Sequence, residues 1–178
     1  MRRVAIIGSS GSGKSTLARR LAARLDLAQL ELVSLFHQAG WTELPLSDFS
    51  SLVSELAAGD SWVIEGNYAQ SRDLVLDRPD TVVWLRLPSR VVMKQVFWRT
   101  SSRVVFRRQL WNGNRETLRA VLSRDPARSI VMWAWTMHDK YDQDYEALCL
   151  AAPTEQRWVV LRRRRQVERF LTLADAGK

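Results

Sequence analysis

The sequence predicts an α/β fold in which helices cover both faces of a parallel β-sheet. Short apolar runs alternate along the chain with longer stretches whose apolar residues recur at helical spacing. The runs are apolar throughout, as expected for strands that are buried on both faces. Strands that alternate with helices in this way pair in parallel through right-handed crossovers.

Each element follows from its local pattern. The expected strands are 4–7, 29–33, 62–64, 81–85 and 158–161. The expected helices are 15–25, 47–58, a long stretch after Pro88 that breaks at 112–114, 115–123, one that begins at 125–126, and 167–173. Ser47 is the predicted N-cap of the second helix. Ligands of such sheets bind beyond the carboxyl ends of the strands, where we expect the functional site.

Length and composition are those of one globular domain, expected to span 1–178. No apolar run approaches the ~18 residues that a membrane helix needs, and the N-terminal residues do not form a signal peptide. A single cysteine, Cys149, cannot form an internal disulfide. These observations favour a cytoplasmic protein.

Positive charge is concentrated in one segment. The formal net charge is +8, and residues 90–128 carry ten basic against two acidic side chains. Such a field attracts phosphate groups, whether they belong to a nucleotide or to a nucleic acid.

Residues 8–15 (GSSGSGKS) fit the phosphate-loop pattern G-x-x-x-x-G-K-[ST], between an apolar strand and an amphipathic helix. The glycines let successive N–H groups turn toward an anion, and the helix N-terminus adds its positive dipole end. The pattern predicts a P-loop NTPase that binds ATP. The residues expected to bind the nucleotide phosphates are Gly8, Ser9, Gly11, Ser12, Gly13, Lys14, Ser15 and Thr16.

Three of the polar residues have distinct expected roles. Lys14 is expected to neutralise the β- and γ-phosphates as a catalytic residue, and the Ser15 hydroxyl to bind Mg²⁺. Glu65 ends an apolar run, where a P-loop protein holds the hydration shell of its Mg²⁺ ion. ATP and Mg²⁺ are therefore the expected cofactors.

Further motifs, together with the phosphate loop, resemble those of the small nucleotide and metabolite kinases, adenylate kinase among them. They are residues 35–41 (LFHQAGW), 65–68 (EGNY), 84–88 (WLRLP) and 110–115 (LWNGNR). Over nearly its whole length, the chain is most similar to the adenylate-kinase-related P-loop proteins often labelled topology-modulation-protein-like. The resemblance implies a five-stranded parallel sheet of order 2-3-1-4-5, a mobile helical lid at about 99–128, and ATP·Mg²⁺ as phosphoryl donor. It leaves the acceptor undefined.

Two positions depart from this group. Relatives tend to carry Leu-Asp where this chain has Leu32-Val33, and an aspartate where it has Arg86. Val33 cannot deprotonate an acceptor hydroxyl, whereas an acceptor that is already an anion, such as a nucleoside monophosphate, needs no base. Val33 therefore indicates either a phosphate acceptor or a weakened kinase.

Arg99, Arg103 and Arg107 recur every four residues and are expected on one helical face. Like charges at this spacing repel by a few tenths of a kcal/mol, a cost that an anionic ligand would relieve. In phosphoryl-transfer enzymes such arginines stabilise the charge on the transferred group. Arg103 and Arg107 are the first choices as catalytic residues and Arg99 the third, with a solvated basic face as the alternative.

The acceptor is expected near the loops that follow the second and third strands. The candidate acceptor residues are Phe36, His37, Trp41, Asn67, Tyr68 and Arg72. Arg164 belongs to an arginine run after the last strand, where this architecture has the loop around the adenine; a solvated turn is the alternative. Trp133 and Met137 are expected in the core, and His138 at the surface.

Three functions remain open from the sequence. The leading one is an ATP-dependent phosphotransferase of the nucleotide-kinase type that acts on a small acceptor. The second is a nucleic-acid-associated ATP-binding protein, because aromatic residues are interleaved with the basic ones in 90–128. The third is a nucleotide-sensing protein with little kinase activity, which rests on Val33.

Overall fold

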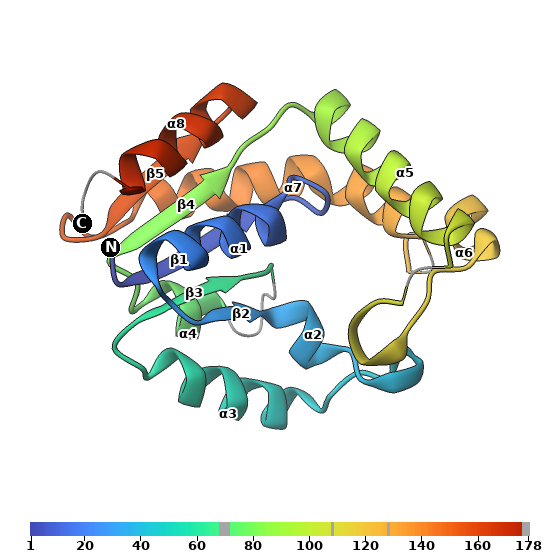
Figure 1. Cartoon of the computed structure of the whole chain (residues 1–178), viewed down its shortest axis with the longest axis horizontal. Helices are drawn as coiled ribbons and strands as arrows, with labels where there is room; N and C mark the ends of the chain where they lie inside the picture. The colour runs from blue at the N-terminus through green and yellow to red at the C-terminus, as the bar shows by residue number, and fades with distance from the viewer. Residues whose placement is uncertain (68–71, 108, 128, 176–178) are drawn as a thin grey trace.

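The computed structural model describes residues 1–67, 72–107, 109–127 and 129–175. Five strands form one parallel sheet in the order β2-β3-β1-β4-β5 (Figure 1). The strands are β1 (Arg3–Gly8), β2 (Gln29–Glu31), β3 (Trp62–Glu65), β4 (Thr81–Leu85) and β5 (Arg157–Leu161). The expected α/β class and strand order are confirmed.

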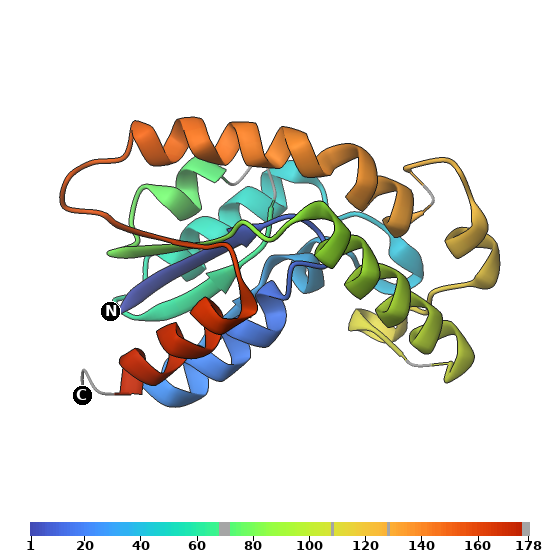
Figure 2. The ribbon, with the colours of Figure 1, turned by 90° about the horizontal axis from the view of Figure 1, so that it is seen from above.

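Helices cover both faces of this sheet (Figure 2). The α-helices are α1 (Lys14–Leu25), α2 (Leu32–Phe36), α3 (Leu46–Ala57), α4 (Arg72–Leu76), α5 (Ser89–Val105), α6 (Leu118–Leu122), α7 (Ile130–Leu150) and α8 (Arg164–Asp175), with 3₁₀ turns η1 (Ala39–Trp41) and η3 (Trp111–Gly113). Helices α1 and α8 pack on one face, and α3, α4 and α7 pack on the other. Among the described residues, no helix is both long and apolar enough to cross a lipid bilayer.

The side chains of β1 show why the strands are apolar throughout. Val4 and Ile6 point toward α1 and α8, whereas Ala5 and Ile7 point toward α3 and α7. All four are at most 4% exposed. A central strand that is buried on both sides has no polar face, so its sequence shows no alternation.

Several predicted boundaries are wrong for local reasons. The strand expected at 29–33 ends at Glu31, because its only neighbour β3 ends at Glu65, the residue opposite in register. Helix α3 begins at Leu46 with Pro45 at its N-cap, so Ser47 is not the cap. Ser129, whose hydroxyl accepts from the N–H of Met132, caps the helix expected to begin at 125–126. Helix α4 was not predicted at all, and the helix expected at 115–123 is limited to α6.

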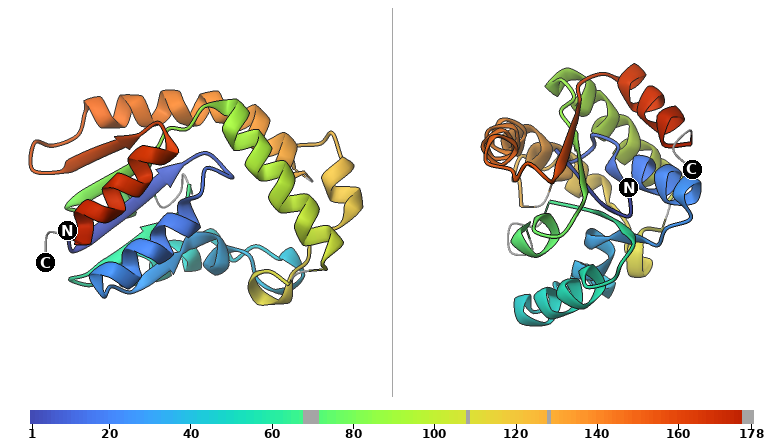
Figure 3. Two further views of the ribbon diagram at one scale, coloured as in Figure 1. Left: turned by 45° about the horizontal axis from the view of Figure 1, so that its top comes forward. Right: turned by 90° about the vertical axis from the view of Figure 1, so that its left-hand side faces the viewer.

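Helices α5 and α7 extend past the carboxyl ends of the strands and carry η3 and α6 at their far end (Figure 3). Buried Val92 and Val96 of α5 pack with Ala134 of α7 to join the two helices. This projecting segment contains the residues expected as the lid. Trp133, expected in the core, is 38% exposed on α7, whereas Met137 packs against the core as predicted.

Candidate functional site

The phosphate-loop residues lie between the end of β1 and the start of α1. Gly8, Gly11 and Gly13 have φ angles of 144°, 83° and 100°, in the region that L-residues with a side chain avoid. A Cβ atom on Gly11 would lie 2.0 Å from Cγ2 of Val96, so α5 packs directly on the loop. The loop therefore needs glycine both for its torsions and for the close approach of the lid helix.

Lys14 folds back onto this loop. Its Nζ donates to the carbonyl oxygens of Gly8 at 2.9 Å and of Ser9 at 3.2 Å. Desolvation lowers the pKa of Lys14 to about 8, although the carboxylate of Glu65 opposes the shift. A phosphate in the loop would supply the anionic partner that favours the charged ammonium.

Three oxygen atoms converge at the start of α1. The Ser15 hydroxyl oxygen lies 2.8 Å from Oε1 of Glu31 and 2.7 Å from Oε1 of Glu65. Burial raises the pKa of Glu65 to about 7, against the attraction of Lys14. One hydroxyl proton cannot be donated to both carboxylates at once, so this arrangement suits a shared proton or a cation.

The donor set at Ser15 fits Mg²⁺. Hydroxyl and carboxylate oxygens are ligands that this ion prefers, and it usually completes its shell with water and phosphate oxygens. Across the part of the chain that the structure describes, no three acidic, histidine or cysteine side chains form a protein-only metal site. The sequence predicted Ser15 and Glu65 for this role but missed Glu31. The place of Glu31 beside Glu65 becomes visible only in the pairing of β2 with β3.

Arg99 is close enough to the phosphate loop for its charge to act on Lys14. Its Nε atom is buried without a hydrogen-bond partner in the described structure. Desolvation lowers its pKa, as does Arg103, while Glu116, Glu65 and Glu31 oppose the shift. Arg99 and Lys14 are close enough for each positive charge to be felt at the loop. Two cations there would attract a polyphosphate strongly.

The two arginines that the sequence favoured lie elsewhere. Arg103 donates to Glu116 Oε1 at 3.0 Å and lies over the ring of Trp111. Arg107 lies past the end of α5, exposed and with a φ of 45°. The expected row of three is therefore wrong, because α5 ends at Val105 and only the first two arginines share its surface.

The segment expected as the lid, which we call the lid from here on, contacts the loop that follows β2. Hydrogen bonds connect 111–115 of the lid to 31–41, and we call these contacts the lid clasp. Trp111 Nε1 donates to Glu31 Oε2 at 2.8 Å. The Asn112 amide donates to the carbonyls of Ser34 and His37, the Asn114 amide donates to Gln38 and accepts from the Trp41 N–H, and Trp41 Nε1 donates to the carbonyl of Arg115. The clasp ties the lid directly to one of the two carboxylates beside Ser15.

The candidate acceptor residues are distributed around the clasp and β3. Phe36 is buried against Phe49 in the core, and Trp41 belongs to the clasp. His37 packs edge-on against both Phe36 and Trp41, and burial lowers its pKa, although Glu43 opposes the shift. Its Nδ1 atom is buried without a partner in the described structure.

Asn67 and Arg72 lie on either side of the segment that contains Tyr68, which is outside the described residues. The Asn67 amide donates to the carbonyl of Gly8. Arg72 Nη2 lies 3.4 Å from Asp144 Oδ2. Both line a small cavity of about 20 Å³ beside Gly66. That volume holds about one water molecule.

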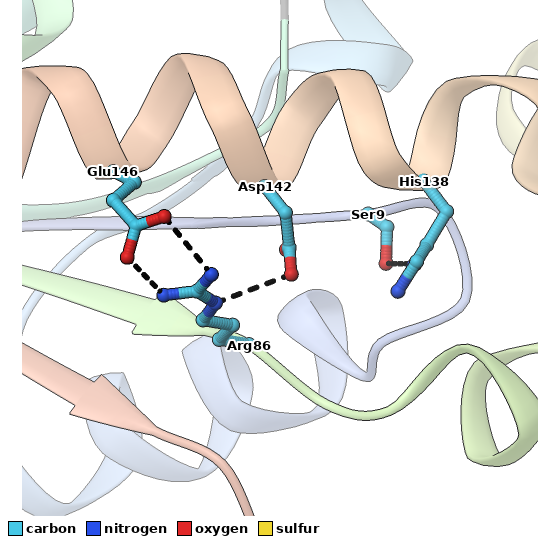
Figure 4. A network of polar contacts seen from close by, with 5 residues as sticks. All are labelled: Ser9, Arg86, His138, Asp142 and Glu146. Carbon is cyan, nitrogen blue, oxygen red and sulfur yellow. Dashed lines mark hydrogen bonds and ion pairs between the residues drawn. The ribbon is translucent and has the colours of Figure 1, made fainter.

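Helix α7 contacts the phosphate loop from the other side (Figure 4). His138, expected at the surface, is only 6% exposed, and its Nδ1 lies 3.2 Å from the Ser9 hydroxyl. The prediction is wrong because α7 continues past the sheet and covers the loop. The Ser12 hydroxyl is also buried, without a partner among the described residues, and Thr16 is exposed.

Arg86, just after the end of β4, is bonded to two acidic residues of α7. It donates to Glu146 Oε1 at 2.7 Å and Oε2 at 3.2 Å, and to Asp142 Oδ2 at 3.2 Å (Figure 4). These two carboxylates balance the charge of Arg86, at a position where the family resemblance leads us to expect an aspartate. The contact fixes the end of β4 to α7.

Arg164 lines a groove of about 830 Å³ between the first half of α5 and the β5–α8 loop. The groove adjoins the phosphate loop, because Gln95 lines it and lies 4.0 Å from where a Cβ atom of Gly13 would be. The sequence did not single out Gln95, and an isolated glutamine on a helix gives no signal. The groove residues are Leu87, Pro88, Arg90, Val91, Lys94, Gln95, Trp98, Arg162, Arg163 and Arg164.

The sheet order, the phosphate loop and the helices on both faces define the P-loop kinase fold. Shikimate kinase from Acinetobacter baumannii in complex with shikimate is similar, with a TM-score of 0.57 and 14% identity over 100% of this chain and 95% of that chain. Shikimate kinase from Bacteroides thetaiotaomicron has a TM-score of 0.55 and 14% identity over 99% and 97%. At such identities the likeness concerns the fold alone. No protein-family model and no curated protein sequence matches this chain.

Proposed function

We propose that this protein is an ATP- and Mg²⁺-dependent phosphotransferase of the nucleotide-kinase type, related to the topology-modulation-protein-like kinases. The observation that carries the proposal is the convergence of the Ser15 hydroxyl with the carboxylates of Glu31 and Glu65, beside Lys14. Phosphoryl transfer needs a metal and fixed cations around the β- and γ-phosphates more than it needs covalent chemistry. This end of the phosphate loop offers oxygen ligands for the metal and a fixed cation in Lys14.

Each group would act on a different part of the nucleotide. The N–H groups of the loop and Lys14 would hold the β- and γ-phosphates, and Arg99 would neutralise the group in transfer. Mg²⁺, held by Ser15 with Glu31 and Glu65, would neutralise charge on the phosphate oxygens. Arg103 is bonded to Glu116 in the clasped lid, so it would act only after release.

The adenine would lie in the groove that Leu87, Val91, Gln95 and Arg164 help to line. Leu87 and Val91 offer apolar contact to a base, and the Gln95 Nε2 atom is buried without a partner in the described structure. We propose Arg164 as a backbone and side-chain contact at the edge of the base. Arg107, just after the end of α5, is not among the residues that line the groove.

The acceptor is proposed to be a small anion that enters near His37, Asn67 and Arg72. The γ-phosphoryl group would pass to an acceptor oxygen as its bond to the bridging oxygen of ADP breaks. An anionic acceptor oxygen has no proton to lose, which fits Val33. The two similar kinases are named for shikimate, and an acceptor with a hydroxyl group would instead require Glu31 to take the proton.

The test is calorimetric titration with MgATP, followed by ADP-release assays with nucleoside monophosphates and small hydroxy acids. Lys14→Ala should abolish MgATP binding, and Glu65→Gln and Ser15→Ala should weaken ATP binding only when Mg²⁺ is present. Ser47→Ala, outside the phosphate loop, is the matched control for Ser15→Ala. Absence of MgATP binding in the unaltered protein would refute the proposal.

A second candidate function is supported by exposed aromatic residues on α5 and just after its end. Phe97 and Trp98 on α5 are 58% and 76% exposed, and Phe106 after α5 is 68% exposed. Basic residues are interleaved with them in the sequence. Base stacking on such rings together with phosphate contacts is typical of single-strand binding. This function predicts oligonucleotide affinity that falls steeply with salt. Affinity that does not change with salt would exclude it.

A further inference from the structure

The groove beside α5 carries more positive charge than a nucleotide base requires. Five of its lining residues are basic, and none is acidic. The basic residues are Arg90, Lys94, Arg162, Arg163 and Arg164. Glu146 is close enough to Arg162 to have its pKa lowered by it, but Arg86 already bonds both oxygens of this carboxylate. The base and ribose of ATP are neutral, so these cations have no partner on them.

The positive charge of the groove belongs to side chains that acidic residues of the described structure do not neutralise. Within the described ranges, no ion pair involves Arg90, Lys94 or Arg163. The N–H groups of Arg162 and Arg163 both donate to Gln166 Oε1, so these two backbone donors are not available to an anion. Arg90 and Lys94 are four residues apart on α5, where like charges repel. An anion between α5 and the β5–α8 loop would relieve this repulsion.

The groove leads outward from the phosphate loop. At its inner end, Gln95 joins it to Gly13 of the phosphate loop and keeps a buried Nε2 atom without a partner in the described structure. Farther out, Val91 and Trp98 give it an apolar surface on α5. A nucleotide with its 5′-phosphates in the loop would therefore direct its base and ribose outward, among the cations.

We propose that the groove binds a nucleotide that carries a second phosphate on its ribose, held by Arg90, Lys94 and Arg163. The proposal rests on the proposed nucleotide site and extends it to a ligand class. The ligand chemistry is a ribose 2′- or 3′-phosphate next to a base. It could come from a free nucleoside bisphosphate or from a nucleotide within a single strand, whose 3′-phosphate continues the chain.

The test compares adenosine 5′-monophosphate with adenosine 3′,5′-bisphosphate and 2′,5′-bisphosphate by calorimetry at low salt. We expect one bisphosphate to bind at least about tenfold tighter, as two charge-assisted contacts allow. The triple variant Arg90→Ala/Lys94→Ala/Arg163→Ala should reduce this ratio to near one and leave MgATP affinity within about twofold. Arg169→Ala, on α8 but outside the groove, should keep the ratio.

The outcomes separate the two proposals. If MgATP binds but mono- and bisphosphates bind equally, the second-phosphate site is refuted and the nucleotide site stands. If MgATP does not bind, the proposed function itself fails. A 5′-phosphorylated triadenylate distinguishes the sources. If the groove binds a single strand, the triadenylate should bind tighter than the bisphosphate, and its affinity should depend more steeply on salt. If the groove binds a free nucleotide, the triadenylate should bind no tighter than the bisphosphate.

Discussion

Gly11 shows at the scale of one residue how the lid helix and the phosphate loop share space. Its φ is 83°, and a Cβ atom would lie 2.0 Å from Val96 Cγ2. We predict that Gly11→Ala abolishes MgATP binding and lowers the free energy of unfolding by about 2–4 kcal/mol, as overpacking and strain add. Thermal unfolding and calorimetry measure both.

Gly40→Ala is the matched control for this substitution. Gly40 also has a positive φ, 70°, but nothing lies within 4 Å of its added Cβ. It should cost only the backbone strain, about 1 kcal/mol, and leave nucleotide binding intact. Equal effects of the two substitutions would show that the contact with Val96 is unimportant.

Asp80 connects the starts of β1 and β4. Burial alone would raise its pKa, but hydrogen bonds from the N–H groups of Arg3 and Arg2 and from the Thr81 hydroxyl outweigh burial and lower it. A lowered carboxyl pKa stabilises the fold above the unfolded-state value of 3.8, and the stabilisation is lost as the pH falls through the folded-state pKa.

Asp80→Asn should therefore destabilise the protein by about 1–2 kcal/mol at neutral pH. The unfolding free energies of the variant and the unaltered protein should converge in acid, as urea titrations at several pH values would show. Exposed Asp60→Asn should change little at any pH. A difference that persists unchanged below pH 3.8 would contradict the assignment.

At this scale the sequence identified the residues of the phosphate loop but not their partners. The four-residue spacing predicts that Arg99, Arg103 and Arg107 share one helical face. It does not say where the helix ends, so it could not show that Arg107 lies past the end of α5. Glu31 was missed because strand pairing across β2 and β3, which no local pattern reveals, brings it beside Ser15.

At the scale of elements, the lid clasp holds η3 on η1. Asn112 and Asn114 provide four of its hydrogen bonds through their amides. Asn112→Ala/Asn114→Ala removes them, and each is worth about 1 kcal/mol. We expect the Trp41 amide, which donates to Asn114, to exchange hydrogen at least about tenfold faster. Mass-spectrometric or NMR exchange measures this.

Gln109→Ala is the control within the lid, because this side chain is exposed and has no bond in the clasp. Unchanged exchange at Trp41 in the double variant would mean that the clasp does not hold the lid. In the sequence, the motif 110–115 indicates only a resemblance to the adenylate-kinase-related P-loop proteins. Its turn-forming asparagines gave no sign that they bind backbone carbonyls from 34 to 38, which lie more than 70 residues earlier.

At the scale of the molecule, α7 links the core, the phosphate loop and the lid. Tyr141 and Tyr145 pack under the sheet, His138 reaches Ser9, and Ala134 packs on α5. The alternation of strands and helices was sufficient to predict the sheet class, because burial on both faces leaves a clear pattern. The extent of α7 beyond the sheet was not predictable, since its exposed and buried faces change along its length.

Arg86 tests this linkage. Arg86→Asp introduces the residue that the family resemblance leads us to expect, but it places a third carboxylate beside Asp142 and Glu146. We expect a loss of about 1–3 kcal/mol in unfolding free energy, moderated by partial solvent exposure. Urea denaturation measures it. Exposed Arg78→Asp makes the same charge change as a control, and Arg86→Asp/Glu146→Arg should recover part of the loss. No loss in Arg86→Asp would mean that the pair contributes nothing.

The absence of a side chain at Gly11 has a mechanical consequence. Helix α5 rests on the very loop that would receive the polyphosphate, and the same helix begins the lid. An adjustment of the loop around its ligand would press on α5 at Val92 and Val96, the residues that face Gly11. Occupancy of the phosphate loop would therefore act directly on α5, and through α5 on the segment expected as the lid.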